Sequence, residues 1–245
     1  MRIAFAFIVL ILVSCSSESE KYKMIQFGKS SEKPESTDAL LVKTMAKSDE
    51  KVRVLFPGEK SELNEMVYQL GKGDLVELLI DTKELKKGDQ LELMDFREAE
   101  EISNIIEGLG EKIEEKERFR LLQYFFASPI AYEYKQGVFI YRKHLSNSGK
   151  KGIKNSIYRI AMECELLDGK KVYSTEKSAD LFEFNKSMPD QVTEGLGVVM
   201  DMMEEGDEFW AVVPSISSFG KIGIEKIIPP DEPLVYKLKL IEIII

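Results

Sequence analysis

Few residues of this chain are of the types that carry out covalent or metal-dependent chemistry. The 245 residues include one histidine, His144, and two cysteines, Cys15 and Cys164. A zinc cluster of His and Cys ligands needs about four donors, so the count excludes one. A Ser-His-Asp type of centre needs a positioned histidine and is disfavoured, because His144 stands in a polar segment and is interpreted as exposed. Two cysteines are also too few for a disulfide framework.

The acidic residues point to a solvated surface rather than to catalysis. The 43 Asp and Glu exceed the 34 Lys and Arg, which gives a net charge of −9. Nucleic-acid binders and polybasic membrane-surface binders need a basic face, so both classes are disfavoured. Asp168, Asp207 and Asp231 stand beside turn residues and are predicted to form turns. A metal-dependent or acid–base hydrolase therefore has little support, and we expect no metal and no cofactor.

The chemistry that the spacing does suggest is lipidation of Cys15. Residues 3–13 form an apolar run of eleven, which is shorter than the roughly 20 residues of a membrane-spanning helix and matches a secretory signal. The run ends in Leu12-Val13-Ser14-Cys15, which resembles a bacterial lipobox. We predict a signal peptide over 1–14 and a lipid-modified tether over 15–23, with the protein anchored in the bacterial cell envelope, at the outer membrane on its periplasmic side or surface. The alternative is an ordinary signal peptide with a chance cysteine.

Three regions of the remaining chain differ in pattern. Residues 24–96 contain short apolar runs divided by turn signals, as expected for a small sheet domain. Residues 97–136 are charged and carry apolar side chains near helical spacing, which predicts a helical linker that packs on a neighbour. Gly108 and Gly110 should weaken or break that helix. Residues 137–245 again contain short strands.

The last region predicts an α+β domain. Residues 158–166 alternate apolar with mostly polar side chains at a period of two. In residues 209–213, Phe209, Ala211 and Val213 alternate with Trp210 and Val212, and in residues 234–240 every second side chain from Leu234 to Leu240 is apolar, so both stretches also predict strands. Leu196, Val199 and Met203 stand at helical spacing. These elements predict a curved antiparallel sheet around a short helix. Residues 214–233 show no strand period, and a loop of this length is usually functional.

Several stretches of this region follow, in order and at nearly ungapped spacing, the pattern of a known family. They are an acidic-Gly turn with its following strand, an aromatic-x-aromatic strand, a helix with a Gly-Asp turn, and two ends of a long loop: Leu167–Thr175, Leu181–Phe184, Glu194–Asp207, Val213–Gly220 and Ile227–Tyr236. Residues from about Ser156 to Ile243 thereby resemble the FKBP family of peptidyl-prolyl cis-trans isomerases.

The resemblance implies a substrate-binding pocket whose lining can be carried over residue by residue. The implied lining residues are Met162, Val172, Tyr173, Phe182, Val192, Thr193, Leu196, Phe219, Ile227 and Tyr236. Four of them fit the family pattern: Phe182, Val192, Ile227 and Tyr236. The alternative for every one of them is plain core packing.

The other implied pocket residues depart from the family. The family usually has Tyr at Met162, Phe-Asp at Val172-Tyr173 and Ile at Thr193. It usually has Trp at Leu196, as the pocket floor, and Tyr at Phe219. Phe219 cannot donate the hydrogen bond that this Tyr gives to the substrate carbonyl. These departures put full catalytic strength in doubt.

The implied reaction explains the absence of catalytic side chains. Rotation about an X-Pro bond has a barrier of ~18–20 kcal/mol, and a dry apolar pocket lowers it without a nucleophile or a proton relay. The leading hypothesis is therefore a membrane-anchored isomerase that assists folding of exported proteins by acting on X-Pro segments. The alternative is a non-catalytic FKBP-like chaperone or interaction module that binds extended polypeptide.

An internal sequence repeat suggests a second, degenerate copy of the domain in residues 24–96. Residues 66–80 parallel residues 199–213, including Gly73-Asp74 against Gly206-Asp207, and Leu91 is aligned with Leu234. The arrangement resembles the tandem FKBP lipoproteins of Bacteroidetes-type bacteria. The alternative is two unrelated strand-rich segments that share a Gly-Asp turn.

Overall fold

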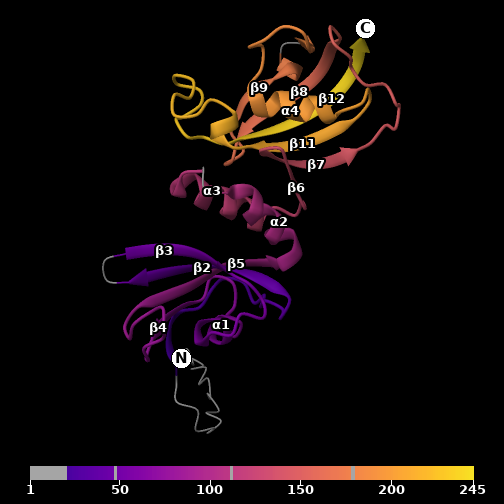
Figure 1. Cartoon of the computed structure of the whole chain (residues 1–245). Coiled ribbons are helices and arrows are strands. Elements are labelled where there is room, and N and C mark those ends of the chain that lie inside the picture. The colour runs from indigo at the N-terminus through magenta and orange to yellow at the C-terminus, as the bar shows by residue number, and fades with distance from the viewer. Residues whose placement is uncertain (1–20, 47–48, 111–112, 178–179) are drawn as a thin grey trace, which may run out of the picture.

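The chain forms two antiparallel sheets with two helices between them (Figure 1). The structure is a computed structural model, and it describes residues 21–46, 49–110, 113–177 and 180–245. Each sheet carries one short helix of its own, and the connecting helices α2 and α3 lie between the sheets (Figure 1). Cys15 and the predicted signal peptide lie outside the described residues.

The first sheet contains five strands in the order β1-β4-β5-β2-β3. In chain order its elements are β1 (Tyr22–Gln26), β2 (Asp38–Ala46), β3 (Asp49–Leu55), α1 (Glu62–Val67), β4 (Leu75–Leu78) and β5 (Gln90–Glu98). Helix α1 places Leu63, Met66 and Val67 against the buried leucines of β5, Leu91 and Leu93. This region therefore has a hydrophobic core of its own.

The predicted linker forms two helices, α2 (Ala99–Leu109) and α3 (Glu115–Ala127). Helix α2 ends at Gly110, as expected, whereas Gly108 lies inside the helix and does not break it. Of the prediction that both glycines weaken or break the helix, the break at Gly108 is therefore wrong. A Cβ at Gly108 would lie 2.3 Å from Cδ2 of Tyr134. The glycine is thus required by the close approach of this ring and is tolerated within the helix.

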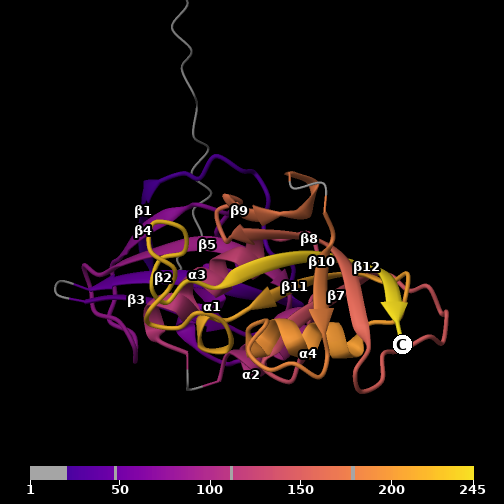
Figure 2. The same cartoon turned by 90° about the horizontal axis from the view of Figure 1, so that it is seen from above.

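The second sheet has the order β10-β8-β12-β11-β7-β6, with β9 paired to β8. Its elements are β6 (Glu133–Lys135), β7 (Val138–His144), β8 (Ile157–Leu166), β9 (Lys171–Ser174), η1 (Thr175–Lys177), β10 (Phe182–Asn185), α4 (Glu194–Met202), β11 (Glu208–Val213), η2 (Ser215–Ser217) and β12 (Leu234–Ile244). Helix α4 runs along the sheet (Figure 2) and contributes Leu196, Val199 and Met200 to its core. The α+β prediction is confirmed. The sheet begins at Glu133, inside the segment predicted as linker.

The local pattern of β8 explains how the sheet faces its core. Side chains of β8 alternate between buried and half-buried along its length, as its period of two predicts. His144, at the end of β7, is exposed, which confirms its interpretation as a surface residue.

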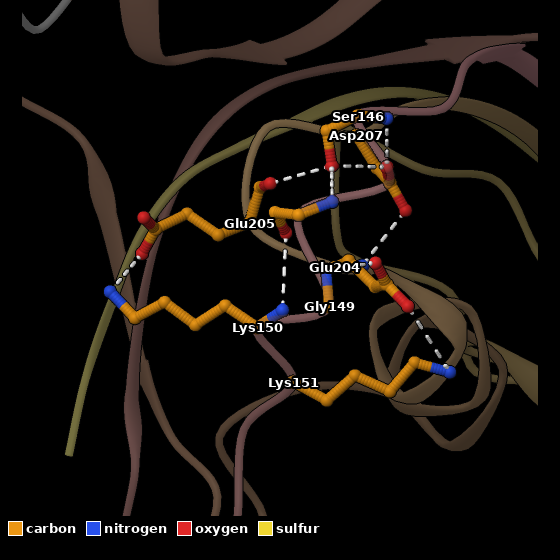
Figure 3. Close-up of polar contacts among 8 residues, drawn as sticks. Ser146, Gly149, Lys150, Lys151, Glu204, Glu205 and Asp207 are labelled. Carbon is orange, nitrogen blue, oxygen red and sulfur yellow. Dashed lines mark hydrogen bonds and ion pairs between the residues drawn. The ribbon is translucent and has the colours of Figure 1, made fainter.

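The two sheets repeat one arrangement of strands and turns. Strands β1, β4, β5 and β2 follow one another across the first sheet as β7, β11, β12 and β8 do across the second. The Gly-Asp turns match in detail: the Asp74 carboxylate accepts hydrogen bonds from Gly28 N at 2.7 Å and Gly71 N at 2.8 Å. The Asp207 carboxylate accepts bonds of the same lengths from Ser146 N and Glu204 N (Figure 3). These contacts confirm that Asp207 forms a turn.

The register of the repeat corrects one sequence alignment. Gly73 N donates to Leu93 O at 2.6 Å, and Gly206 N donates to Leu240 O at 2.7 Å. Leu93 therefore corresponds to Leu240, and Leu91 corresponds to Leu238 rather than to Leu234. A shift of four residues keeps the same side chains on the same face of a strand, so the apolar pattern alone could not fix the register.

The helices between the sheets build a third core that both sheets share. Phe125 of α3 and Ile102 of α2 pack with Leu41 of β2 on one side and with Val212 of β11 and Val235 of β12 on the other. Val212 and Val235 belong to the phase of their strands that faces away from α4. The linker therefore covers the outer face of the second sheet, and the prediction that it packs on a neighbour is confirmed.

Candidate functional site

A cavity of about 310 Å³ opens between α4, strands β8 and β12, and the loop between β11 and β12. It is lined by fourteen uncharged residues: Met162, Cys164, Val172, Tyr173, Phe182, Gln191, Val192, Thr193, Leu196, Phe219, Ile224, Ile227, Ile228 and Tyr236. All ten residues implied by the sequence are among them. The structure thus brings together side chains that are spread over 75 positions, from 162 to 236, of the chain.

The floor of the cavity is built by regular elements. Met162 and Cys164 project from the inward phase of β8, and Tyr236 of β12 stands opposite Cys164 in the strand register. Leu196 lies in the first turn of α4 and is 4% exposed. These residues belong to the core of the second sheet as well as to the cavity, so pocket and core packing are not alternatives for them.

The start of α4 approaches β11 closely, and this contact fixes the position of Leu196 at the base of the cavity. A Cβ at Gly195 would lie 2.4 Å from Cγ1 of Val213 and 3.0 Å from Ser217 O. Only glycine therefore allows the first turn of α4 to sit against the end of β11. That position sets Leu196 and the preceding Thr193 at the cavity.

The rim of the cavity is more exposed than its floor. Tyr173 of β9 is 43% exposed, and Ile227 is 48% exposed. Val172, Phe182 and Phe219 are half-buried and pack against the core of the sheet. An incoming apolar group would therefore meet exposed side chains first and buried ones deeper in the cavity.

Four lining residues were missed by the sequence reasoning. Ile228 follows the predicted Ile227, and Cys164 lies two residues after the predicted Met162 on the inward face of β8, which was a signal for it. Ile224 lies in the loop without periodicity. The Gln191 side chain closes the turn that follows β10, because its Nε2 donates to Asn185 O at 2.7 Å and to Met188 O at 2.8 Å. No local sequence pattern indicates such a turn.

The polar groups of the cavity are neutral. Burial raises the pKa of the Cys164 thiol to about 12, so the thiol stays protonated near neutral pH and is not a nucleophile. Burial also raises the pKa of the Tyr236 hydroxyl. Thr193 Oγ1 and Ser218 Oγ are close enough to lower that pKa, but among the described residues neither hydroxyl has a partner at hydrogen-bond geometry. The cavity can desolvate an apolar group but cannot carry out acid–base chemistry at neutral pH.

Two further observations concern the described part of the chain. It contains no cluster of three or more His, Cys, Asp or Glu side chains placed to hold a metal ion. None of its helices has the length and apolar composition needed to cross a membrane.

Comparison with known proteins identifies the domain that holds the cavity. Residues 149–241 match the family model of FKBP-type peptidyl-prolyl cis-trans isomerases. No curated protein sequence gives a significant match.

A search of solved structures gives matches at low identity. FkpA from Escherichia coli is 16% identical, with a TM-score of 0.44, over 59% of this chain and 61% of that chain. A peptidyl-prolyl cis-trans isomerase from Pseudomonas syringae pv. tomato is 23% identical, with a TM-score of 0.44, over 52% of this chain and 90% of that chain. The N-terminal domain of FKBP42 from Arabidopsis thaliana is 19% identical, with a TM-score of 0.43, over 46% of this chain and 92% of that chain. On the family match, the C-terminal domain of this chain, residues 149–241, belongs to the FKBP-type peptidyl-prolyl cis-trans isomerases.

Proposed function

We propose that this protein is a peptidyl-prolyl cis-trans isomerase that acts on X-Pro segments of unfolded or exported polypeptides. The observation that carries the proposal is the uncharged cavity within the family domain, which gathers all ten residues that the family pattern implies. The lipobox-like sequence ending at Cys15 supports anchoring in the bacterial cell envelope by a lipid on that residue.

The cavity would act by enclosing the proline ring and removing the amide from water. An amide resists rotation because of its charge-separated resonance form, and a dry environment weakens that form. The floor at Leu196 and Tyr236 would hold the ring, while Phe182 and Phe219 would flank it. Side chains that contact the twisted amide more closely than the planar one would lower the barrier.

The departures from the family pattern support a weakened activity. Phe219 offers no donor to the substrate carbonyl, and Leu196 gives a smaller floor than tryptophan. Tyr173, which stands where the family has Asp, lies exposed at the rim. The enclosure is thus kept, while polar stabilisation of the amide is reduced.

The experiment that tests the proposal is isomerisation of a short Leu-Pro peptide by residues 21–245, which contain every described element. We expect the rate to rise in proportion to protein concentration. Ile227→Glu should abolish the effect, because it places a charge at the mouth of an uncharged cavity. The matched control is Ile222→Glu in the same loop, at a side chain that is 89% exposed and does not line the cavity. Wild-type protein without any rate acceleration would refute the enzyme assignment.

A non-catalytic chaperone or interaction module is the second candidate. It is favoured by the exposed apolar side chains around and beyond the cavity, which include Met188 at 58% and Ile222 at 89% exposed. Such a surface can hold extended apolar segments. This function predicts that the protein suppresses aggregation of an unfolded client without accelerating isomerisation, and that Ile222→Glu weakens the suppression.

A further inference from the structure

Helix α3 contacts both ends of the loop that forms one wall of the cavity. We call residues 214–233, between β11 and β12, the wall loop; four of its side chains line the cavity: Phe219, Ile224, Ile227 and Ile228. Glu117 and Arg120 of α3 are three residues apart and so lie on one face of the helix. Each of them contacts a different end of the wall loop.

Glu117 holds the start of the wall loop. Its side chain is nearly fully buried, at 2% exposed. Its Oε1 accepts a hydrogen bond from Ser215 N at 2.7 Å, and its Oε2 accepts one from Ser215 Oγ at 2.6 Å. A buried carboxylate is costly unless it is hydrogen-bonded, and these two bonds offset part of that cost, although burial still raises the pKa of Glu117 above its usual range. Removing the carboxylate would leave two buried donors at Ser215, four residues before Phe219.

Arg120 holds the end of the wall loop. Its guanidinium donates to the carboxylate of Glu232, a residue that is 8% exposed, and to the backbone carbonyl of Asp231. Asp231 N in turn donates to Gly220 O at 2.9 Å, which joins the two ends of the loop. The loop is therefore closed on itself and fixed to α3 at both ends.

The helix that fixes the wall loop lies outside the segment that matches the family, residues 149–241. Its apolar face belongs to the core shared by the two sheets, where Leu121 and Phe125 pack with Leu41 of β2. The position of the cavity wall is thus set by a helix that is also held by the first sheet.

We propose that Glu117 and Arg120 are positioning residues of the cavity, which hold the wall loop where its side chains can enclose a proline ring. The inference rests on the proposed function of the cavity. It adds that ligand binding depends on a helix outside the family segment.

The test compares variants of the full-length chain, purified in detergent, by hydrogen exchange and by affinity for a Leu-Pro peptide. Glu117→Ala should speed exchange of the wall-loop amides by roughly 10- to 100-fold, the equivalent of hydrogen bonds to a charged group, while β8 amides exchange as before. Peptide affinity should fall, and KM should rise more than kcat falls. Glu117→Gln keeps an acceptor for Ser215, so its loop exchange rate and its peptide affinity should lie between those of wild type and Glu117→Ala. Glu114→Gln is the matched control, because the only partner of the Glu114 side chain among the described residues is Lys221 of the same loop, in an exposed ion pair.

The outcomes separate the inference from the proposed function. Unchanged loop exchange in a folded Glu117→Ala chain would overturn the inference, and so would faster exchange with unchanged peptide affinity. If Glu117→Ala does not fold, Ser215→Ala replaces it, since it removes only the Oγ bond, and the same criteria apply. Wild-type protein that binds the peptide without isomerising it would refute catalysis, and the inference would then be decided by the peptide affinities of wild type and Glu117→Ala. Wild-type protein that binds no peptide would refute both.

Discussion

Replacing Phe219 by tyrosine would test whether the cavity lacks a hydrogen-bond donor. Phe219 is half-buried, lines the cavity and belongs to a loop that is fixed at both ends, so one added oxygen should leave the fold unchanged. A hydrogen bond contributes a net ~0.5–1.5 kcal/mol, and ~1.36 kcal/mol corresponds to a tenfold change in rate. Phe219→Tyr should therefore raise kcat/KM by about two- to tenfold if the new hydroxyl bonds to the twisted amide.

The assay is the coupled isomerisation of a Leu-Pro peptide, with thermal unfolding as the check on folding. Tyr141→Phe serves as the control, because Tyr141 of β7 packs against Trp210 and does not line the cavity, so loss of its hydroxyl should leave kcat/KM near the wild-type value. Adding Leu196→Trp to Phe219→Tyr should raise kcat/KM further by enlarging the apolar floor. A folded Phe219→Tyr protein whose kcat/KM stays the same or falls would refute the missing-donor reasoning.

Four further predictions concern other parts of the chain. Cys15→Ser should release the protein from membranes, as measured by fractionation, whereas a Ser variant that still pellets with membranes would argue against lipidation. Gly108→Ala should lower the free energy of unfolding by ~1–3 kcal/mol through overpacking. Gly197→Ala should raise the free energy of unfolding by ~0.5–1 kcal/mol, because the nearest atom outside the backbone of its own helix, Val192 Cγ2, lies 3.8 Å from the new Cβ. The hydrogen bond from Lys171 is the main cause that lowers the pKa of Glu163 from 4.5 to about 2. The stability from Glu163 should thus be complete above pH 4.5 and decrease towards pH 2, and an acid titration of Glu163→Gln should lack that component.

The residues of the candidate site could largely be inferred from the sequence, because the family pattern runs through it almost without gaps. Phe182 and Tyr236 match the family pattern, and the nearly ungapped spacing then assigns the other implied lining residues to the same cavity. The structure brings all of them together there. Ile224 and Gln191 escaped because their positions follow from loop and turn geometry rather than from periodicity.

Other features depend on contacts that no local pattern encodes. Glu117 and Ser215 are 98 residues apart, and the helical period of the linker gives no reason to join them. Gly108 was expected to weaken or break the helix because propensity describes an exposed helix, whereas here the Tyr134 ring occupies the space of a side chain. The register of the first copy was misplaced because a strand pattern of period two repeats itself every two residues.

The core shared by the two sheets has a consequence for how the chain unfolds. Phe125, Val212 and Leu41 come from the linker, the second sheet and the first sheet, and all three are nearly inaccessible to water. Melting either sheet would uncover the apolar side chains of the other two partners, at about 25 cal/mol for each Å² exposed. Each sheet has its own core, but the shared core couples the two sheets thermodynamically. Heat should therefore unfold them in one cooperative transition rather than in two independent transitions.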